Sequence, residues 1–291
     1  MIYELNKPDY EKVRSLFHPL AWHLTSAAVL DGNSPGRVFV DDPANPQTAF
    51  MFSPEECYLA GNPDNDAFNR ALNHAIYTGE VPGEKVNALF FVCHPESWEA
   101  RLAALLDPHP PIAMQPRRHV MKRRHYVCRQ VKYDWRANLP DGFAVRRITE
   151  ALLNQAGLKI PDHVHGWMKN NWGSTAGFLE RGFGFVTIHN NQAVSWSLAD
   201  CVSGDACEIG IRTAEAFRRR GLATITAAAA AEHALSNGFA AAKAVGWHCP
   251  EDNHGSIGTA EKVGFERERD YTMYYILLDK ADQQQNKLEQ Q

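Results

Sequence analysis

The second half of the chain contains a run that could bind a phosphate group, Arg218-Arg219-Arg220-Gly221-Leu222-Ala223-Thr224. An acidic and apolar run, Cys207 to Thr213, comes before it, and an alanine-rich segment comes after it. This order predicts a strand, a basic glycine turn and a helix. The first backbone N–H groups of a helix have no partner inside the helix and point outward, so a glycine turn at such an end can hold a diphosphate. The arginines add positive charge, and we expect an anion site at this turn.

Regular elements must position this turn. Apolar runs joined by short polar turns predict a three-stranded antiparallel meander. Arg220 to Asn237 predicts a long helix that ends at Gly238, and five consecutive alanines let its backbone approach the sheet. A strand, this helix and a further strand form a right-handed parallel crossover, with a ligand expected at the carboxyl ends of its strands. The three strands of the meander are predicted at 183–188, 193–199 and 206–213. The consecutive alanines are residues 227–231, and the further strand is predicted at 241–247.

Two motifs in this half of the chain resemble one known family. The spacing Arg218-x-x-Gly221-x-Ala223 resembles the Arg/Gln-x-x-Gly-x-Gly/Ala signature of the GNAT superfamily of acetyltransferases, whose members bind the pyrophosphate of acetyl-CoA at this turn. The segment Asn253 to Phe265 is similar to the closing segment of the family, in which an asparagine opens a helix that ends in Gly-Phe and leads to the last strand, here 271–278. The same closing segment also looks like the subgroup that includes the zwittermicin self-resistance acetyltransferases. The resemblance covers about residues 143 to 278.

The resemblance implies a fold and a donor. The fold is α+β, with a mixed, mostly antiparallel central sheet and flanking helices, and the co-substrate is acetyl-CoA. By the same resemblance, backbone N–H groups near Ile211 and Thr213 bind the pantetheine arm and polarise the thioester carbonyl. The other residues that the resemblance assigns to coenzyme binding are Arg218, Arg219, Arg220, Gly221, Leu222, Ala223, Thr224, Asn253 and Ser256.

The sequence departs from the family at the proton donor. In many members a tyrosine seven residues after the asparagine protonates the departing CoA thiolate, and here that position is Ala260, which has no proton to give. Substitutes are Tyr271 or Tyr274 on the final strand, or the pair His248 and Cys249 beside the fifth strand. A thiolate, with a pKa near the neutral range, can also leave without help.

The implied reaction is direct acetyl transfer to the amine of a small molecule. An ammonium must first lose a proton, so a carboxylate is needed as base, directly or through a water molecule. Glu208, on the strand before the turn, is the candidate, and the other interpretation is a surface carboxylate or a partner of Arg212. The predicted helix 161–172 carries histidines and tryptophans, including Trp167, that suit a planar or cationic acceptor or ordinary packing.

Three other classes of function fit an anion-binding turn less well or in a different way. A non-catalytic acyl-CoA sensor would keep the Arg218 turn and lose the acid, consistent with Ala260. A P-loop NTPase is excluded because the chain lacks Gly-x-x-x-x-Gly-Lys-Ser/Thr. An enzyme that acetylates RNA or DNA would normally carry a stronger positive charge than the net −4 of this chain.

The first half of the chain predicts a second α+β domain, which resembles a degenerate GNAT-like half without a coenzyme motif. A turn-rich stretch at 138–142 predicts the boundary, so the expected divisions are 1–138, 143–279 and a polar tail, 280–291. The elements predicted in the first half are helices at 8–17, 64–77 and 97–106 and strands at 37–40, 48–52, 57–60, 87–93 and 119–128.

Composition narrows the environment and the partners. The 291 residues are 44% hydrophobic and 22% charged, typical of a globular protein with two domains. Six widely spaced cysteines, no leader and no long apolar run predict a reduced, cytoplasmic protein without a membrane partner. No His/Cys spacing fits a structural zinc site, so we expect no metal. A basic run at 117–124 is interpreted as a solvated strand face rather than a nucleic-acid surface, and a monomer or homodimer is expected.

Overall fold

A computed structural model describes residues 1–83, 86, 88–106, 118–237 and 244–278, in which the chain forms two compact units. Unit one comprises Met1–Leu20, Gly36–Met121 and the chain from Thr272 on, and unit two comprises Ala21–Pro35 and Lys122–Tyr271. This division differs from the expected boundary near residue 140. An early segment joins unit two, and the end of the last strand joins unit one. The predicted tail, 280–291, lies outside the described residues.

Unit one contains a six-stranded mixed sheet with the order β1-β2-β3-β4-β5-β12. Neighbouring strands are antiparallel except β4 and β5, which are parallel. The strands are β1 (Tyr3–Glu4), β2 (Arg37–Val40), β3 (Thr48–Phe52), β4 (Cys57–Gly61), β5 (Ala88–His94) and the end of β12 (Glu266–Leu277). The helices are η1 (Lys7–Val13), α1 (Arg14–Phe17), η2 (His18–Leu20), α3 (Asp66–Thr78) and α4 (Trp98–Leu106).

Unit two contains the sheet on which the predicted turn depends, with the order β6-β11-β10-β9-β8-β7. The pairing is antiparallel except between β10 and β11, which confirms the mostly antiparallel sheet and the parallel crossover. The strands are β6 (Arg118–Cys128), β7 (Phe143–Arg147), β8 (Gly184–His189), β9 (Gln192–Ser203), β10 (Ala206–Thr213) and β11 (Ala244–Pro250).

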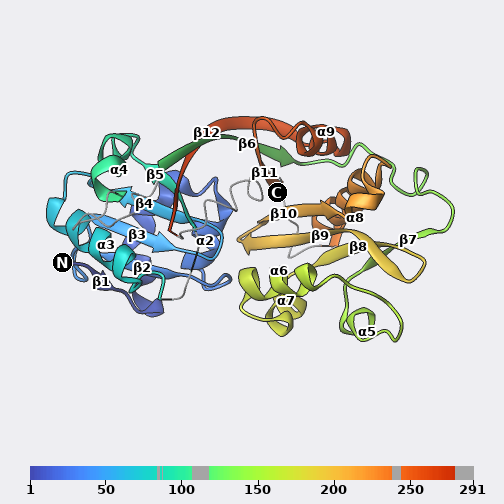
Figure 1. The fold of residues 1–291 in the computed structure, drawn as a ribbon, viewed down its shortest axis with the longest axis horizontal. Coiled ribbons are helices and arrows are strands. Elements are labelled where there is room, and N and C mark those ends of the chain that lie inside the picture. Colours follow the sequence, from blue (N-terminus) through green and yellow to red (C-terminus); the bar gives the residue numbers. More distant parts are fainter. Residues whose placement is uncertain (84–85, 87, 107–117, 238–243, 279–291) are drawn as a thin grey trace. The chain divides into compact units, whose positions relative to one another are not determined.

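Helices cover both faces of the sheet in unit two (Figure 1). On one face α8 packs on β8, β9 and β10, because its run Ala227 to Ala231 is buried and brings the helix backbone close to the strands. On the other face α2 and α6 pack on β9, and α7 packs on α6. The helices are α2 (Leu24–Leu30), α5 (Glu150–Leu153), α6 (Asp162–Trp172), α7 (Thr175–Arg181), η3 (Glu215–Phe217), α8 (Leu222–Asn237) and α9 (His254–Val263).

The segment Ala21–Pro35 belongs to unit two although it is distant in sequence from the rest of that unit. Its helix α2 packs on β9, and after the helix the Asn33 side-chain amide donates a hydrogen bond of 3.1 Å to the carbonyl of Val202. Nothing in the local sequence of this segment indicates its partner, because the contact joins residues 169 positions apart. This segment brings His23 and Leu24 to the candidate site.

Most predicted elements are confirmed, with two differences. The run 8–17 forms a 3-10 helix followed by one turn of α-helix. The last strand begins at Glu266 rather than at residue 271, because β12 follows the end of α9 after Gly264, whose φ of 119° ends the helix. The predicted stop at Gly238 and the start of the further strand at 241–243 lie outside the described residues. Within the described residues, no helix is both long and apolar enough to cross a membrane.

Candidate active site

Glu208 stands where the parallel strands β10 and β11 separate. The two strands are in register from Ala206, opposite Ala244, to Glu208, opposite Gly246. The register of β10 with β9 shifts between Glu208 and Ile209, where Asp200 of β9 is the extra residue of a bulge. Bulges often occur next to functional sites. In the described part of the chain the register of β10 with β11 ends at Glu208, and the segment from Ile209 to Thr213, which pairs with β9, is called the open part of β10.

The Glu208 carboxylate is enclosed rather than exposed. Its side chain is 6% exposed, one oxygen accepts the backbone N–H of Leu24 at 2.7 Å, and the same oxygen lies 3.0 Å from His248 Nε2. The thiol of Cys201 donates to the other oxygen at 3.5 Å. Burial alone would raise the pKa of Glu208, but the charge and hydrogen bond of His248 and the Leu24 N–H outweigh it and hold the pKa well below its usual range. Glu208 is therefore a carboxylate at neutral pH, and its burial excludes the alternative interpretation as a surface carboxylate.

His248 lies between two other imidazole rings. The register of β11 with β6 puts His248 opposite His125, and their rings stack with centroids 4.4 Å apart and an angle of 18°. On the other face His23, just before α2, stacks with centroids 4.3 Å apart and an angle of 22°. Rings on both faces restrict rotation of the middle ring. His248 is thus fixed with Nε2 toward Glu208.

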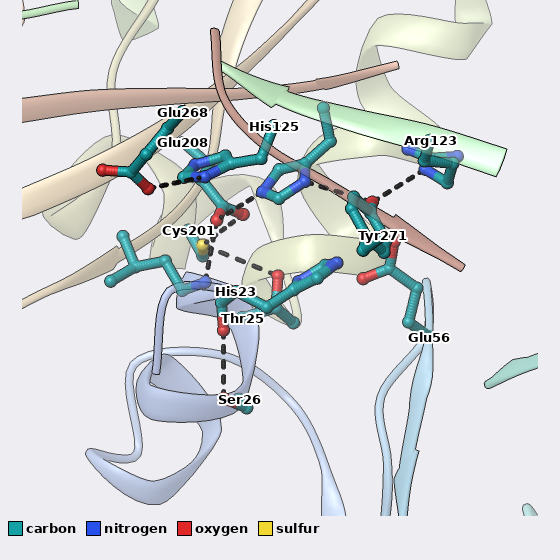
Figure 2. A network of polar contacts seen from close by, with 12 residues as sticks. His23, Thr25, Ser26, Glu56, Arg123, His125, Cys201, Glu208, Glu268 and Tyr271 are labelled. Carbon is teal, nitrogen blue, oxygen red and sulfur yellow. Dashed lines mark hydrogen bonds and ion pairs between the residues drawn. The ribbon is translucent and has the colours of Figure 1, made fainter. Parts of the chain in front are cut away.

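Tyr271 completes a line of polar contacts from Glu208. The second ring nitrogen of His248, Nδ1, lies 3.1 Å from Tyr271 Oη, and that oxygen accepts a hydrogen bond of 2.8 Å from Arg123 Nε. Figure 2 shows these contacts together with those of Glu208. His248 therefore connects the two residues that the sequence suggested for proton transfer, Glu208 and Tyr271. Arg123, interpreted from sequence as part of a solvated face, belongs to this network.

The outer rings of the stack favour the neutral form. Burial, and then the charge on His248, lower the pKa of His125 to about 4, although Glu208 and Glu268 act in the opposite direction. Burial also holds the pKa of His23 well below its usual range. Both rings are therefore neutral at pH 7.

These lowered pKa values predict acid destabilisation. In the unfolded chain His125 binds a proton below about pH 6.5, whereas in the folded protein it does so only below about pH 4. The free energy of unfolding therefore falls as the pH falls through that window. We expect His125 to contribute a loss of roughly 1–3 kcal/mol between these limits. Urea denaturation at pH 7, 5.5 and 4.5 measures it, with His125→Gln showing a shallower slope and His189→Gln the wild-type slope. Equal slopes for wild type and His125→Gln would contradict the assignment.

The same cluster brings together three groups that could ligate a metal ion. His23, Glu208 and His248 offer ligand atoms that all lie within 4.8 Å of one another. Ligands must direct their lone pairs at one point, whereas the rings of His23 and His248 stack nearly face to face. In addition, Glu208 is ionised and lies at hydrogen-bond distance from His248 Nε2, so that nitrogen carries a proton and not a free lone pair. The observed arrangement is that of a hydrogen-bonded relay.

The basic turn follows β10 and η3 and has the predicted form. Arg219 and Gly221 have positive φ angles of 60° and 79°, and α8 begins at Leu222. A Cβ at Gly221 would meet no atom within 4 Å, so its backbone angle rather than crowding favours glycine there. The three arginines and Gly221 are exposed, Ala223 is half-buried, and Leu222 and Thr224 are buried. The helix start and the exposed arginines fit a diphosphate, with the backbone rather than the buried side chains facing it.

The predicted coenzyme residues on the closing helix have structural contacts. Asn253 caps α9 by accepting the backbone N–H of Ser256 at 3.0 Å, and the Ser256 hydroxyl accepts the indole N–H of Trp247 at 2.9 Å. Ala260 is fully buried in the core. That position therefore offers neither a proton donor nor an exposed side chain.

Helix α6 covers β9 and β10 beside the bulge. The ring of Trp167 lies against Gly210, where a Cβ would approach the ring to 2.2 Å, and its indole N–H donates to Asp200 at 2.6 Å. Trp172 is buried and donates to the carbonyl of Ala199 at 2.9 Å. The two tryptophans of the predicted helix thus differ: Trp172 packs in the core, whereas Trp167 is half-buried next to the open part of β10.

Sequence reasoning missed two members of the site, His23 and His125. Both lie far from Glu208 in the sequence, and neither belongs to a motif. A periodic strand around His125 was predicted, and its register with β11 would have placed the ring opposite His248. No comparable signal marks His23.

Comparisons with known proteins agree with the geometry. A family model described as GNAT acetyltransferase matches residues 14–274. An uncharacterized N-acetyltransferase, YdfB of Bacillus subtilis (strain 168), is 25% identical over 276 residues, which is 94% of this chain and 98% of that protein.

Solved structures share the fold. A GCN5-related N-acetyltransferase-like protein from Streptococcus suis 89/1591 has a TM-score of 0.64 at 21% identity, over 92% of this chain and 98% of that one. A tandem GNAT protein from the clavulanic acid biosynthesis pathway has a TM-score of 0.56 at 14% identity, over 97% and 99% of the two chains. These likenesses show that the chain shares the fold of both proteins over nearly its full length.

Proposed function

Because the chain belongs to the GNAT acetyltransferase family, we propose that it transfers the acetyl group of acetyl-CoA directly to an amine of a small molecule. The observation that carries this proposal is the position of Glu208. It lies on the strand that leads to the basic turn, at the point where β10 parts from β11, and it connects through His248 to Tyr271. The turn proposed to bind the donor and the two proton-transfer groups, Glu208 and Tyr271, therefore belong to the same unit of the chain.

Each group has a role in the proposed reaction. The turn Arg218–Thr224, whose arginines and Gly221 are exposed, and the open part of β10 at Ile211 and Thr213 hold acetyl-CoA, which supplies an activated acetyl thioester. Glu208 provides the negative charge of the base, and Tyr271 provides the proton for the departing thiolate. Asn253 and Ser256 stay predictions as coenzyme contacts, with the helix cap and the Trp247 contact as their present roles.

The lining of the site favours a small acceptor. Leu24 closes one side of Glu208, and the rings of Trp22, His23 and Tyr271 lie beside it, with Trp22 and Tyr271 centroids 4.9 Å apart. A lysine on a folded protein would have to reach past these rings. The resemblance of the closing segment to the zwittermicin self-resistance subgroup supports an amine-bearing antibiotic as one member of the acceptor class.

A thiol-release assay with acetyl-CoA and a panel of small amines tests the proposal. We expect release that depends on the amine, with Glu208→Gln much slower than wild type and Arg218→Ala requiring more acetyl-CoA. An acyl-CoA sensor is the second candidate, favoured by the buried Ala260. Binding of CoA by calorimetry without thiol release for any amine would support the sensor and contradict the transferase.

Gly246 allows Glu208 to occupy its position, and this predicts a sensitive substitution. A Cβ at Gly246 would lie 2.8 Å from Glu208 Cγ. We expect Gly246→Ala to move the carboxylate and to lower kcat by about 10–100-fold, since small displacements of reacting groups cost that much. Gly258→Ala on α9 is the control, because a Cβ there meets nothing within 4 Å. Wild-type kcat for Gly246→Ala would show that the position of Glu208 is unimportant.

A further inference from the structure

The hydrogen bonds from Glu208 to Arg123 have one consistent direction when His248 is neutral. An ionised carboxylate only accepts hydrogen bonds, so the proton of the ring must be on Nε2, 3.0 Å from Glu208. The other nitrogen, Nδ1, then has a lone pair and accepts the hydroxyl proton of Tyr271 at 3.1 Å. Arg123 Nε donates to the same hydroxyl oxygen at 2.8 Å, which stabilises negative charge there. The tyrosine proton therefore points at a base.

The surroundings of His248 suit a ring that gains a proton briefly. Glu208 supplies an ionised carboxylate on one edge, and the stacked rings on both faces hold the orientation. A buried ionic partner stabilises the imidazolium in the same way that a carboxylate does in a catalytic triad. The charged and titratable groups around the ring are Glu208 on β10, Arg123 and His125 on β6, His23 before α2, and Glu268 and Tyr271 on β12.

We propose that Glu208, His248 and Tyr271 form a single relay in which Tyr271 faces the substrates and His248 stores the proton between its removal from the amine and its delivery to the thiolate. This inference rests on the proposed acetyl transfer. In this relay Glu208 acts on the amine through His248 and Tyr271 and does not contact it, because its carboxylate is enclosed and its side chain is only 6% exposed. The relay also joins the general base and the general acid of the reaction in one hydrogen-bonded chain.

The steps balance in atoms and protons. As the amine nitrogen forms its bond to the acetyl carbon, Tyr271 Oη takes a proton from that nitrogen and passes its own proton to His248 Nδ1. The imidazolium is paired with the Glu208 carboxylate. As the carbon–sulfur bond breaks, Tyr271 gives a proton to the sulfur and recovers one from His248. The products are the N-acetyl amine and CoA thiol, and the relay returns to its first state.

The relay also accounts for Ala260. A tyrosine on α9 is unnecessary if the group that removes the proton also returns it. The buried position of Ala260 has no route to a substrate, whereas Tyr271 is half-buried and bonded to a guanidinium.

Nitrogen NMR of the resting protein tests the direction of the relay without any turnover. In protein labelled with ¹⁵N-histidine at pH 7.5, we expect His248 to carry its proton on Nε2 and not on Nδ1, with His248→Gln used to assign the signals. A proton on Nδ1 alone would overturn the proposal, because Tyr271 would then have no base. In Glu208→Gln the preference for Nε2–H should weaken.

Kinetics test whether the three residues act as one unit. We expect His248→Gln and Tyr271→Phe each to lower kcat by about 10²–10⁴-fold and to remove the acidic limb of the pH profile, with the KM for acetyl-CoA unchanged. The double variant should be no slower than the worse single variant, as for residues that act together. Multiplied losses in the double variant, or a wild-type pH profile in His248→Gln, would overturn the relay.

Matched variants separate this proposal from the proposed function. His189→Gln and Tyr133→Phe alter the same residue types outside the network, and they should keep wild-type turnover. If wild type releases no thiol with any amine, the transferase proposal fails, and the NMR result decides the hydrogen-bond order on its own. Thermal midpoints of all variants reveal any loss of folding, and His248→Asn replaces His248→Gln if the latter unfolds.

Discussion

Replacing Glu208 with glutamine is expected to lower kcat at neutral pH by about 10²–10³-fold, within the range that general acid–base groups contribute. The amide oxygen can still accept the N–H of Leu24 and the Nε2–H of His248, so the fold of the site should remain. Only the negative charge is lost, and with it the stabilisation of an imidazolium. Initial rates of thiol release at saturating acetyl-CoA, from pH 6 to 10, measure the effect.

A second carboxylate provides the control for this experiment. Glu232 on α8 pairs with Arg136 at 2.8 Å and is partly exposed, so Glu232→Gln removes the same charge outside the site. We expect wild-type rates for that variant, since exposed ion pairs contribute little. Normal turnover of Glu208→Gln at both neutral and high pH would remove Glu208 as a base.

Replacing Gly221 with valine is expected to weaken CoA binding by about 10–100-fold. Gly221 has a φ of 79°, which a β-branched residue adopts at a cost of roughly 1–3 kcal/mol. The turn would relax toward another backbone shape, and the N–H groups at the start of α8 would no longer converge on a diphosphate. Calorimetric titration with CoA measures the dissociation constant, and a factor of ten corresponds to about 1.4 kcal/mol.

A substitution that introduces the same backbone strain at Gly157, away from the turn, separates an effect on CoA binding from an effect on folding. Gly157 has a φ of 77°, and a Cβ there would also meet nothing within 4 Å. Gly157→Val therefore costs similar local strain in a loop away from the turn, and it should bind CoA like wild type. Equal affinity of the Gly221→Val and wild-type proteins would show that the turn does not hold the coenzyme.

The sequence predicts the donor side of this molecule well because its signals are local. Apolar alternation, polar turns and an alanine-rich helix specify the meander, β10 and α8. The Arg218-x-x-Gly221-x-Ala223 spacing lies within one turn. These features depend on neighbours in the chain, so one sequence is enough to place them.

The proton-transfer network could be predicted only in part because it depends on long-range register. Glu208 and Tyr271 were candidates from their strands, but the contact between them passes through His248, whose orientation depends on stacking with His23 and His125. His23 comes from a segment whose contacts with the rest of unit two join residues far apart in the sequence, 169 positions in the case of Asn33 and Val202. No periodicity in residues 21–35 reports which sheet that segment will cover.

Ala260 shows how a departure from a family pattern can mislead. Read alone, it suggests a protein that binds acyl-CoA and has lost its acid, and its burial agrees with that loss. The contacts of Tyr271 with His248 and Arg123 give a different explanation, since a hydroxyl with a base on one side and a guanidinium on the other is suited to proton transfer.

The most direct test of acetyl transfer is a count of both products in one reaction. With an amine that stimulates thiol release, we expect one mole of N-acetyl amine, measured by mass spectrometry, for each mole of CoA thiol, and about 10²–10³-fold slower formation of both products with Glu208→Gln. Thiol formed without N-acetyl amine, or equal yields from Glu208→Gln and wild type, would contradict it.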